Sequence, residues 1–167
     1  MKNNVKMITI LGILTALYVV MSAFLKFTLF SNIMVDLGYI VFAVALCMYG
    51  PYGTVVGVIG CALESILFSA YGFSVSWAAA NLVIGFASGW MLKRNIHIFA
   101  KCLVIVLSVA VGMLAVKTAV ECYLYSIPLA VKLPKNAVAF AADAVTMMAG
   151  LVFYGKIVKK IEKGFIK

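Results

Sequence analysis

Residues 36–70 read DLGYIVFAVALCMYGPYGTVVGVIGCALESILFSA, two apolar runs on either side of the sequence Gly50-Pro51-Tyr52-Gly53. Glycine and proline together are typical of a tight turn. The two runs therefore predict a pair of helices, Asp36–Tyr49 and Tyr52–Ala70, that fold back on each other as a hairpin. The first of them is short for a membrane span, at ~21 Å for about 14 residues of 1.5 Å each.

Four further apolar segments surround this pair. They are Met7–Leu25, Ser74–Leu92, Ile98–Tyr125 and Asn136–Ile157. Hydrophobic residues make up 66% of the 167 positions and charged residues 11%, whereas soluble domains have about 45–50% and about 25%. Because so few charges cannot cover a water-exposed surface, lipid must be the solvent. The sequence therefore predicts an all-α fold, an integral membrane bundle of six transmembrane helices that forms a single domain over residues 1–167 of a multi-pass protein of the cytoplasmic membrane.

The basic residues indicate how this bundle is oriented. Three short patches that flank apolar segments hold Lys2, Lys6, Lys93, Arg94, Lys101, Lys156, Lys159, Lys160, Lys163 and Lys167. The loops on the other side hold Lys26, Lys132 and Lys135. Because cytoplasmic loops carry the excess of Lys and Arg, both termini are predicted to be cytoplasmic. The net charge of +9 is thus read as an orientation signal, and a nucleic-acid partner is not expected because no basic face with interleaved aromatic residues is present.

The second outer loop, Ser126–Lys135, contains Pro128 and Pro134. Proline removes a backbone donor, so we expect this loop to lack a regular helix. The four cysteines lie in or beside apolar segments without a C-x-x-C pair, and His97 lies in a basic loop. These residues are interpreted as structural, and neither a metal site nor a cofactor is expected.

Five polar side chains interrupt the apolar segments, where an ionisable group costs roughly 2.5–3.5 kcal/mol on insertion scales. They are Glu64, Asn81, Lys117, Glu121 and Asp143. At 1.5 Å per residue they lie ~6–12 Å below the outer ends of four different helices. We expect them to meet in a solvated pocket that opens to the extracellular side.

Aromatic residues near the same ends add flat surfaces on which a planar ligand can stack. For Tyr123 and Tyr125 an interfacial aromatic belt is the preferred interpretation. The candidate substrate-binding residues are Glu64, Asn81, Lys117, Glu121, Asp143, Trp77, Tyr71 and Tyr39. A structural network is the alternative, since Lys117 and Glu121 are four residues apart on one helix and can neutralise each other.

Small residues indicate where helices come close together. Gly85 and Gly89 in the fourth segment are explained by packing within the bundle. Gly12 and Ala16 form a similar step in the first segment, where an external partner can also dock.

These features resemble the S components of energy-coupling factor (ECF) transporters, the substrate-binding membrane subunits of vitamin importers. The residues that carry the resemblance are Asp36-Leu37-Gly38-Tyr39-Ile40, Tyr49-Gly50-Pro51-Tyr52-Gly53 and the stretch from Gly57 to Glu64, which are similar to the second and third helices of the family. The Gly12 and Ala16 step resembles the family's small-residue motif that contacts the coupling subunit. The sequence Leu25-Lys26-Phe27 resembles riboflavin-type S components, whereas Thr28 and Asn32 stand where that subfamily has acidic residues.

The resemblance implies a substrate-capturing subunit rather than an enzyme. Such a subunit binds a vitamin or related micronutrient under its outer loops and delivers it through a membrane coupling subunit and two cytoplasmic ATPase subunits. Because the sequence has no P-loop, ATP hydrolysis is expected to come from these partners. The sequence does not select one vitamin.

Two other functions remain open at this point. Glu64, Asp143 and Lys117 are candidate acid–base groups of a small intramembrane enzyme, although the sequence has no HExxH motif or nucleophile–base pair. An ion-conducting or scaffold subunit is the second alternative. It should carry charges through both halves of the membrane, and the inner half of the segments is apolar.

Overall fold

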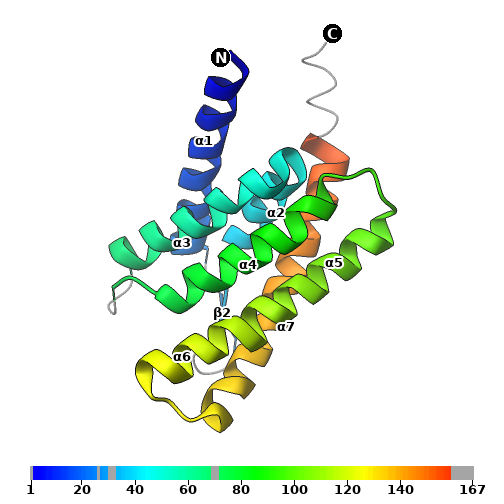
Figure 1. Ribbon diagram of the computed structural model, residues 1–167. Coiled ribbons are helices and arrows are strands. Elements are labelled where there is room, and N and C mark those ends of the chain that lie inside the picture. Colours follow the sequence, from blue (N-terminus) through cyan, green and yellow to red (C-terminus); the bar gives the residue numbers. More distant parts are fainter. Residues whose placement is uncertain (1, 26, 30–32, 69–71, 159–167) are drawn as a thin grey trace.

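The computed structural model describes residues 2–25, 27–29, 33–68 and 72–158 (Figure 1). Its elements are α1 (Lys2–Phe24), β1 (Phe27–Leu29), β2 (Ile33–Val35), α2 (Gly38–Tyr49), the 3-10 helix η1 (Gly50–Gly53), α3 (Thr54–Phe68), α4 (Val75–Leu92), α5 (Ile98–Ala110), the π-helix η2 (Val111–Lys117), α6 (Thr118–Tyr125), α7 (Leu129–Phe153) and the π-helix η3 (Tyr154–Val158). The predicted helical fold is confirmed. The sequence did not predict the short antiparallel hairpin of β1 and β2, in which Phe27 pairs with Val35 and Leu29 with Ile33.

In the described part of the chain, five helical stretches are long and apolar enough to cross a membrane. They are Asn4–Phe24, Gly38–Phe68, Val75–Leu92, Ile98–Tyr125 and Leu129–Ile157. The second stretch contains α2, η1 and α3 together, because α2 alone has only 12 residues. The count of six spans and the cytoplasmic position of both termini therefore stay predictions. The beginning of α1 and the end of η3 lie at the same end of the molecule (Figure 1).

The chain reverses direction at η1, between α2 and α3. Gly50 has a φ of 63°, a conformation that glycine adopts without strain. Beyond the turn, Gly57 of α3 lies directly against α2, since a Cβ at Gly57 would be 2.6 Å from the ring of Phe42. One helical turn later Gly60 lies against Tyr18 of α1 in the same way. The glycines of α3 thus allow it to approach two helices at once.

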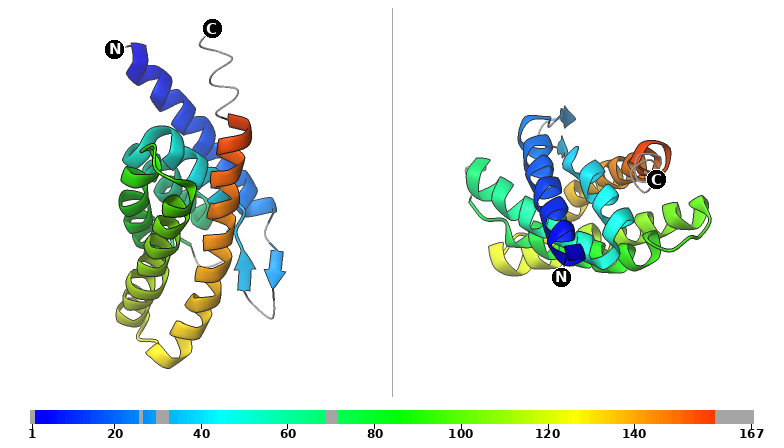
Figure 2. Two further views of the ribbon diagram at one scale, coloured as in Figure 1. Left: turned by 90° about the vertical axis from the view of Figure 1, so that its right-hand side faces the viewer. Right: turned by 90° about the horizontal axis from the view of Figure 1, so that it is seen from above.

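The short helix α2 is the centre of the bundle. The side chains of Tyr39, Phe42 and Leu46 are 0% exposed, and α1, α3, α4 and α7 all contact this helix. At Gly150, α7 comes so close that a Cβ would lie 2.5 Å from the carbonyl oxygen of Ile40. Figure 2 shows α7 running beside α5 and α6, with the β-hairpin next to it. A helix enclosed on all sides need not span a membrane by itself.

The helix α7 corrects the prediction for residues 126–135. It begins at Leu129 and continues through Pro134, so this segment is largely helical. Pro128 directly precedes the helix, where its missing donor costs nothing, and its carbonyl accepts from the backbone N–H groups of Val131 and Lys132. Because proline has no backbone N–H, Pro134 cannot donate to the carbonyl of Ala130 four residues earlier. Both residues are exposed, so this carbonyl can bond to water instead.

Candidate substrate-binding site

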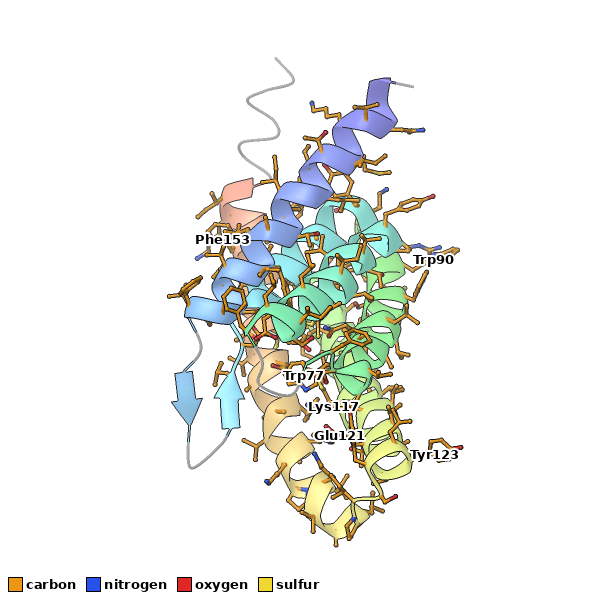
Figure 3. The ribbon with its side chains drawn as sticks, turned by 90° about the vertical axis from the view of Figure 1, so that its left-hand side faces the viewer. Trp77, Trp90, Lys117, Glu121, Tyr123 and Phe153 are labelled. Carbon is orange, nitrogen blue, oxygen red and sulfur yellow. The ribbon has the colours of Figure 1, made fainter. Side chains whose placement is uncertain are left out.

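A cavity of about 690 Å³, here called the polar pocket, lies between α3, α4, α6 and the start of α7. Its lining residues are Asp36, Cys61, Glu64, Ser65, Gly72, Phe73, Ser74, Ser76, Trp77, Glu121, Tyr125, Ile127 and Lys132. Three of these carry carboxyl groups and one carries an ammonium group. The volume is within the range of small-molecule sites, about 300–1,000 Å³. The pocket is at the end of the bundle away from the start of α1, as the labels for Trp77 and Glu121 in Figure 3 show.

Trp77 forms a flat wall of the polar pocket, and Lys117 supports it. The side chain of Trp77 is half-buried at the start of α4. The Nζ atom of Lys117 lies 3.8 Å from the centroid of the Trp77 ring, which is a cation–π contact. Lys117 is 4% exposed and is the last residue of the π-helix η2. Lys117 is thus directed to the tryptophan that lines the pocket, although it does not line the pocket itself.

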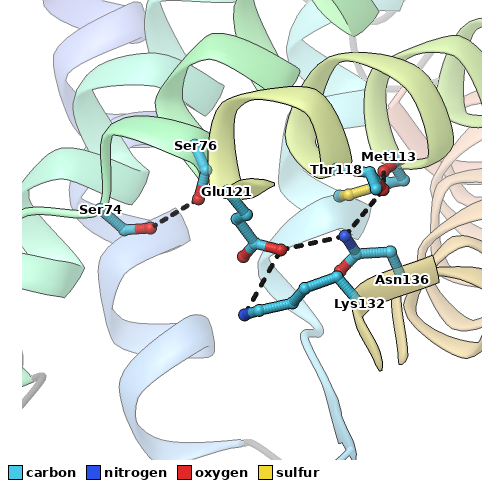
Figure 4. Close-up of polar contacts among 7 residues, drawn as sticks. All are labelled: Ser74, Ser76, Met113, Thr118, Glu121, Lys132 and Asn136. Carbon is cyan, nitrogen blue, oxygen red and sulfur yellow. Dashed lines mark hydrogen bonds and ion pairs between the residues drawn. The ribbon is translucent and has the colours of Figure 1, made fainter. Parts of the chain in front are cut away.

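Glu121 makes its hydrogen bond and its ion pair to α7, and it also interacts electrostatically with Lys117 one turn away. Its Oε2 atom accepts a hydrogen bond of 3.0 Å from Asn136 Nδ2 and lies 3.5 Å from Nζ of Lys132 (Figure 4). Asn136 Nδ2 also donates to Thr118 Oγ1 at 2.9 Å. These contacts connect the first half of α6 to the N-terminal part of α7. The sequence analysis did not propose either residue for the site, because Lys132 was assigned to a loop and Asn136 was read only as the start of a helix.

Asp143 is a deeply buried carboxyl group on α7. It is 1% exposed, and neither of its carboxylate oxygens has a hydrogen-bond partner in the described part of the chain. Buried polar groups nearly always have partners, so an orphaned carboxylate needs an explanation. Lys117 and Asp36 are the charged side chains that interact with it electrostatically. Asp143 is therefore a buried carboxyl group near Lys117 and Asp36, and it is not among the residues that line the polar pocket.

Asp36 also lines the polar pocket, and the sequence analysis did not propose it for the site. Its Oδ1 atom accepts from Ser22 Oγ at 2.6 Å and from the backbone N–H of Gly38 at 2.7 Å. Tyr18 donates to Oδ2 at 3.4 Å. Aspartate just before a helix is a common capping residue, and its position two residues before α2 was the available signal.

Two other candidates have different surroundings. The hydroxyl of Tyr39 donates to Asn81 Oδ1 at 2.7 Å, and Asn81 Nδ2 donates to the carbonyl of Gly57 at 3.1 Å. Both side chains are 0% exposed and are not among the lining residues. They join α2, α3 and α4 beneath the pocket. Tyr71, also a candidate, lies outside the described residues.

Of the eight candidates, Glu64, Trp77 and Glu121 line the polar pocket. Glu64 is half-buried on α3. Tyr125, which we assigned to an aromatic belt, also lines it, whereas Tyr123 is 86% exposed. Among the described residues, no group of three or more His, Cys, Asp or Glu side chains is placed to hold a metal ion.

A second depression, here called the α1 groove, contains the predicted partner-coupling residues. Gly12 and Ala16 line it from α1, and Val55, Ile59 and Leu63 line it from α3. Gly12 is exposed, and a Cβ built on it would meet nothing within 4 Å. The surface at this step is therefore open to a neighbouring helix.

Two solved structures share the fold of this chain. A crystal structure of the S component for biotin from an ECF-type ABC transporter has a TM-score of 0.67 at 18% identity, covering 97% of this chain and 93% of that one. A crystal structure of FolT bound with folic acid has a TM-score of 0.68 at 17% identity, covering 90% and 92%. The fold is thus that of an ECF S component, an integral membrane subunit of a transporter.

The sequence assigns the family more closely. The profile of the ECF-type riboflavin transporter S component family matches residues 2–163. The chain therefore belongs to this family, which is a family of transporter subunits and not of enzymes.

Proposed function

We propose that this chain captures a vitamin or related micronutrient in the polar pocket from the extracellular side and delivers it through a membrane coupling subunit with two cytoplasmic ATPases. The observation that carries the proposal is the pocket itself, in which three carboxyl groups, one ammonium group and the ring of Trp77 surround about 690 Å³ in a family of transporter subunits. Membership of the riboflavin family makes riboflavin the first ligand to test. Its flat ring and polar side chain match a site with one aromatic wall and several hydrogen-bonding groups.

In this proposal the ligand ring lies against Trp77. Stacking on an aromatic wall favours a planar group, and the Lys117 ammonium, 3.8 Å from the ring centroid, keeps the tryptophan in place. Glu64 and Glu121 accept hydrogen bonds from the ligand, as carboxylates do. Asp143 and Lys117 lie outside the lining of the pocket, and in this proposal they act as acceptor and donor for a polar edge of the ligand that extends beyond that lining.

The α1 groove is the proposed contact with the coupling subunit. Small residues let two membrane helices approach until their backbones are close. Gly12 and Ala16 present such a surface on α1, and Val55 and Ile59 of α3 give it an apolar wall. A helix of the coupling subunit would therefore bury the groove without displacing any side chain at Gly12.

The two tryptophans of the chain allow a direct test of the site. A Trp90→Phe variant keeps Trp77 as the only tryptophan, and a Trp77→Phe variant keeps Trp90, which is 62% exposed and outside the polar pocket. We expect riboflavin to quench the fluorescence of the first variant at a stoichiometry of one. We expect the second variant to show at least tenfold weaker binding by calorimetry, which is 1.4 kcal/mol.

Biotin and folic acid serve as comparison ligands in the same titration. Native mass spectrometry of the purified protein reports any ligand that copurifies. If none of the three vitamins binds and no small molecule copurifies, or if Trp77→Phe binds as tightly as Trp90→Phe, the proposed site is wrong.

A further inference from the structure

A third depression, here called the α3/α4 groove, lies on the outside of the bundle and has no part in the proposed capture of the micronutrient. Its volume is about 830 Å³. Leu82, Phe86 and Trp90 follow one another at four-residue intervals along its α4 wall and are 47%, 57% and 62% exposed. Figure 3 shows Trp90 at the periphery of the bundle, away from Trp77.

The charges of this groove are confined to one of its ends. Lys93 and Arg94 follow the last residue of α4 and are both exposed. None of the described residues that line the groove is acidic, so these cations are not neutralised within it. The side chain of Lys93 rests on the η1 turn, because a Cβ at Gly50 would lie 3.0 Å from its Cδ atom. The Lys93 side chain thus lies beside η1, whose residues Pro51 and Tyr52 also line the groove.

The dimensions fit one leaflet of a membrane. From Leu82 to Trp90 the apolar wall covers ~12 Å at 1.5 Å per residue, and one leaflet contributes about 15 Å of hydrocarbon. An apolar channel along the helices with two cations at its membrane-surface end matches a phospholipid with an anionic headgroup. Basic pockets between transmembrane helices bind anionic headgroups in this way. A zwitterionic headgroup gains less, because its own ammonium group opposes the protein cations.

We propose that the α3/α4 groove binds one anionic phospholipid, with an acyl chain along Phe86 and Trp90 and the phosphate at Lys93 and Arg94. The positive charge of the groove favours an anionic headgroup. The apolar wall runs along α4, so the acyl chain lies parallel to this helix. The groove shares no lining residue with the polar pocket, so the lipid proposal can be tested independently of the proposed micronutrient site.

The test is a lipid titration of the purified protein followed by native mass spectrometry. Phosphatidylglycerol and phosphatidylcholine with the same acyl chains are compared. The expected result is a single phosphatidylglycerol adduct with at least tenfold tighter binding than phosphatidylcholine. The double variant Lys93→Gln with Arg94→Gln should lose this preference. The control Lys6→Gln with Lys156→Gln removes the same charge from exposed sites outside the groove and should keep it.

Thermal unfolding of both double variants checks that they are folded. The proposal is overturned if the first double variant keeps the preference, or if the control loses it equally, since nonspecific attraction would then explain the binding. A photoreactive residue at position 86 gives a second readout in the assembled transporter. Crosslinking to lipid is expected, whereas crosslinking to the coupling subunit instead would also overturn the proposal.

Discussion

At the scale of single residues, Lys117 and Asp143 are two buried ionisable groups that interact electrostatically. Both side chains are nearly inaccessible, at 4% and 1% exposure. The lysine is stabilised by the Trp77 ring, whereas the aspartate has no hydrogen-bond partner among the described residues. A charge that is buried without a partner is retained only where something repays its desolvation. A ligand that bridges the two groups would do so.

Replacing Asp143 by asparagine separates a ligand-binding role from a structural one. We expect Asp143→Asn to weaken riboflavin binding at least tenfold, because an amide is a poorer partner for a ligand donor than a carboxylate. Asp143→Ala and Glu64→Ala should have effects of the same size. Calorimetry in detergent measures the affinity, and thermal unfolding measures stability.

The matched control is the double variant Lys117→Met with Asp143→Asn. If Asp143 only compensates the charge of Lys117, the double variant should bind as tightly as a Lys117→Met single variant and should be more stable than it, because both members of the buried pair are removed together. If Asp143 contacts the ligand, the double variant should bind more weakly than Lys117→Met. Normal affinity in the Asp143→Asn and Glu64→Ala single variants would contradict our assignment of both residues.

The sequence could place charged residues in apolar segments but not the direction of their side chains. Glu64 and Glu121 were proposed from helix depth and line the polar pocket. Asn81 comes from the same reasoning, yet it is bonded to Tyr39 and Gly57 between helices. Depth along a helix is readable from a sequence, whereas the rotation of each helix about its axis depends on packing with its neighbours. That rotation decides which polar residues face the cavity.

At the scale of the elements, glycine determines how closely α3 approaches α2. We expect Gly57→Ala to lower stability by about 1–3 kcal/mol, the usual range for overpacking, because the new Cβ would be 2.6 Å from the Phe42 ring. Gly12→Ala is the control, since nothing lies within 4 Å of a Cβ there. Thermal unfolding in detergent compares the two variants with the wild type. Equal melting temperatures in both would contradict the described packing of α3 on α2.

The α1 groove predicts that a substitution at Gly12 affects binding of the coupling subunit and not binding of the ligand. We expect Gly12→Leu to leave riboflavin affinity unchanged and to reduce copurification of the coupling subunit, because a branched side chain fills a surface that must lie close to another helix. Gly155→Leu on η3, where a Cβ also has open space, is the matched control. Equal recovery of the complex from both variants would contradict the assignment of the groove.

Helix positions were largely predictable because apolar runs and the Gly50–Gly53 turn are local signals. The start of α7 was not predicted, because proline inside a helix is normally unfavourable, whereas Pro134 lies inside α7 at an exposed position. The β-hairpin was also missed, because three-residue strands leave too little periodicity to read.

At the scale of the whole molecule, the arrangement of charges predicts a fixed orientation. A cysteine introduced at Ser126, which is exposed between α6 and α7, should react with a membrane-impermeant maleimide in intact cells. A cysteine introduced at Lys156 of η3 should react only after the membrane is permeabilised. The four native cysteines are replaced beforehand to remove background. The reverse labelling pattern would invert the orientation and place the polar pocket on the cytoplasmic side.

Three residues of η1 and α3 lie between the α1 groove and the α3/α4 groove and line both of them. Tyr52, Val55 and Ile59 line both the α1 groove and the α3/α4 groove. An acyl chain bound in the α3/α4 groove would contact these side chains from one side. It would thereby change the surface that the coupling subunit contacts in the α1 groove. Uptake rates would then respond to the headgroup composition of the bilayer, even though no lipid reaches the nutrient.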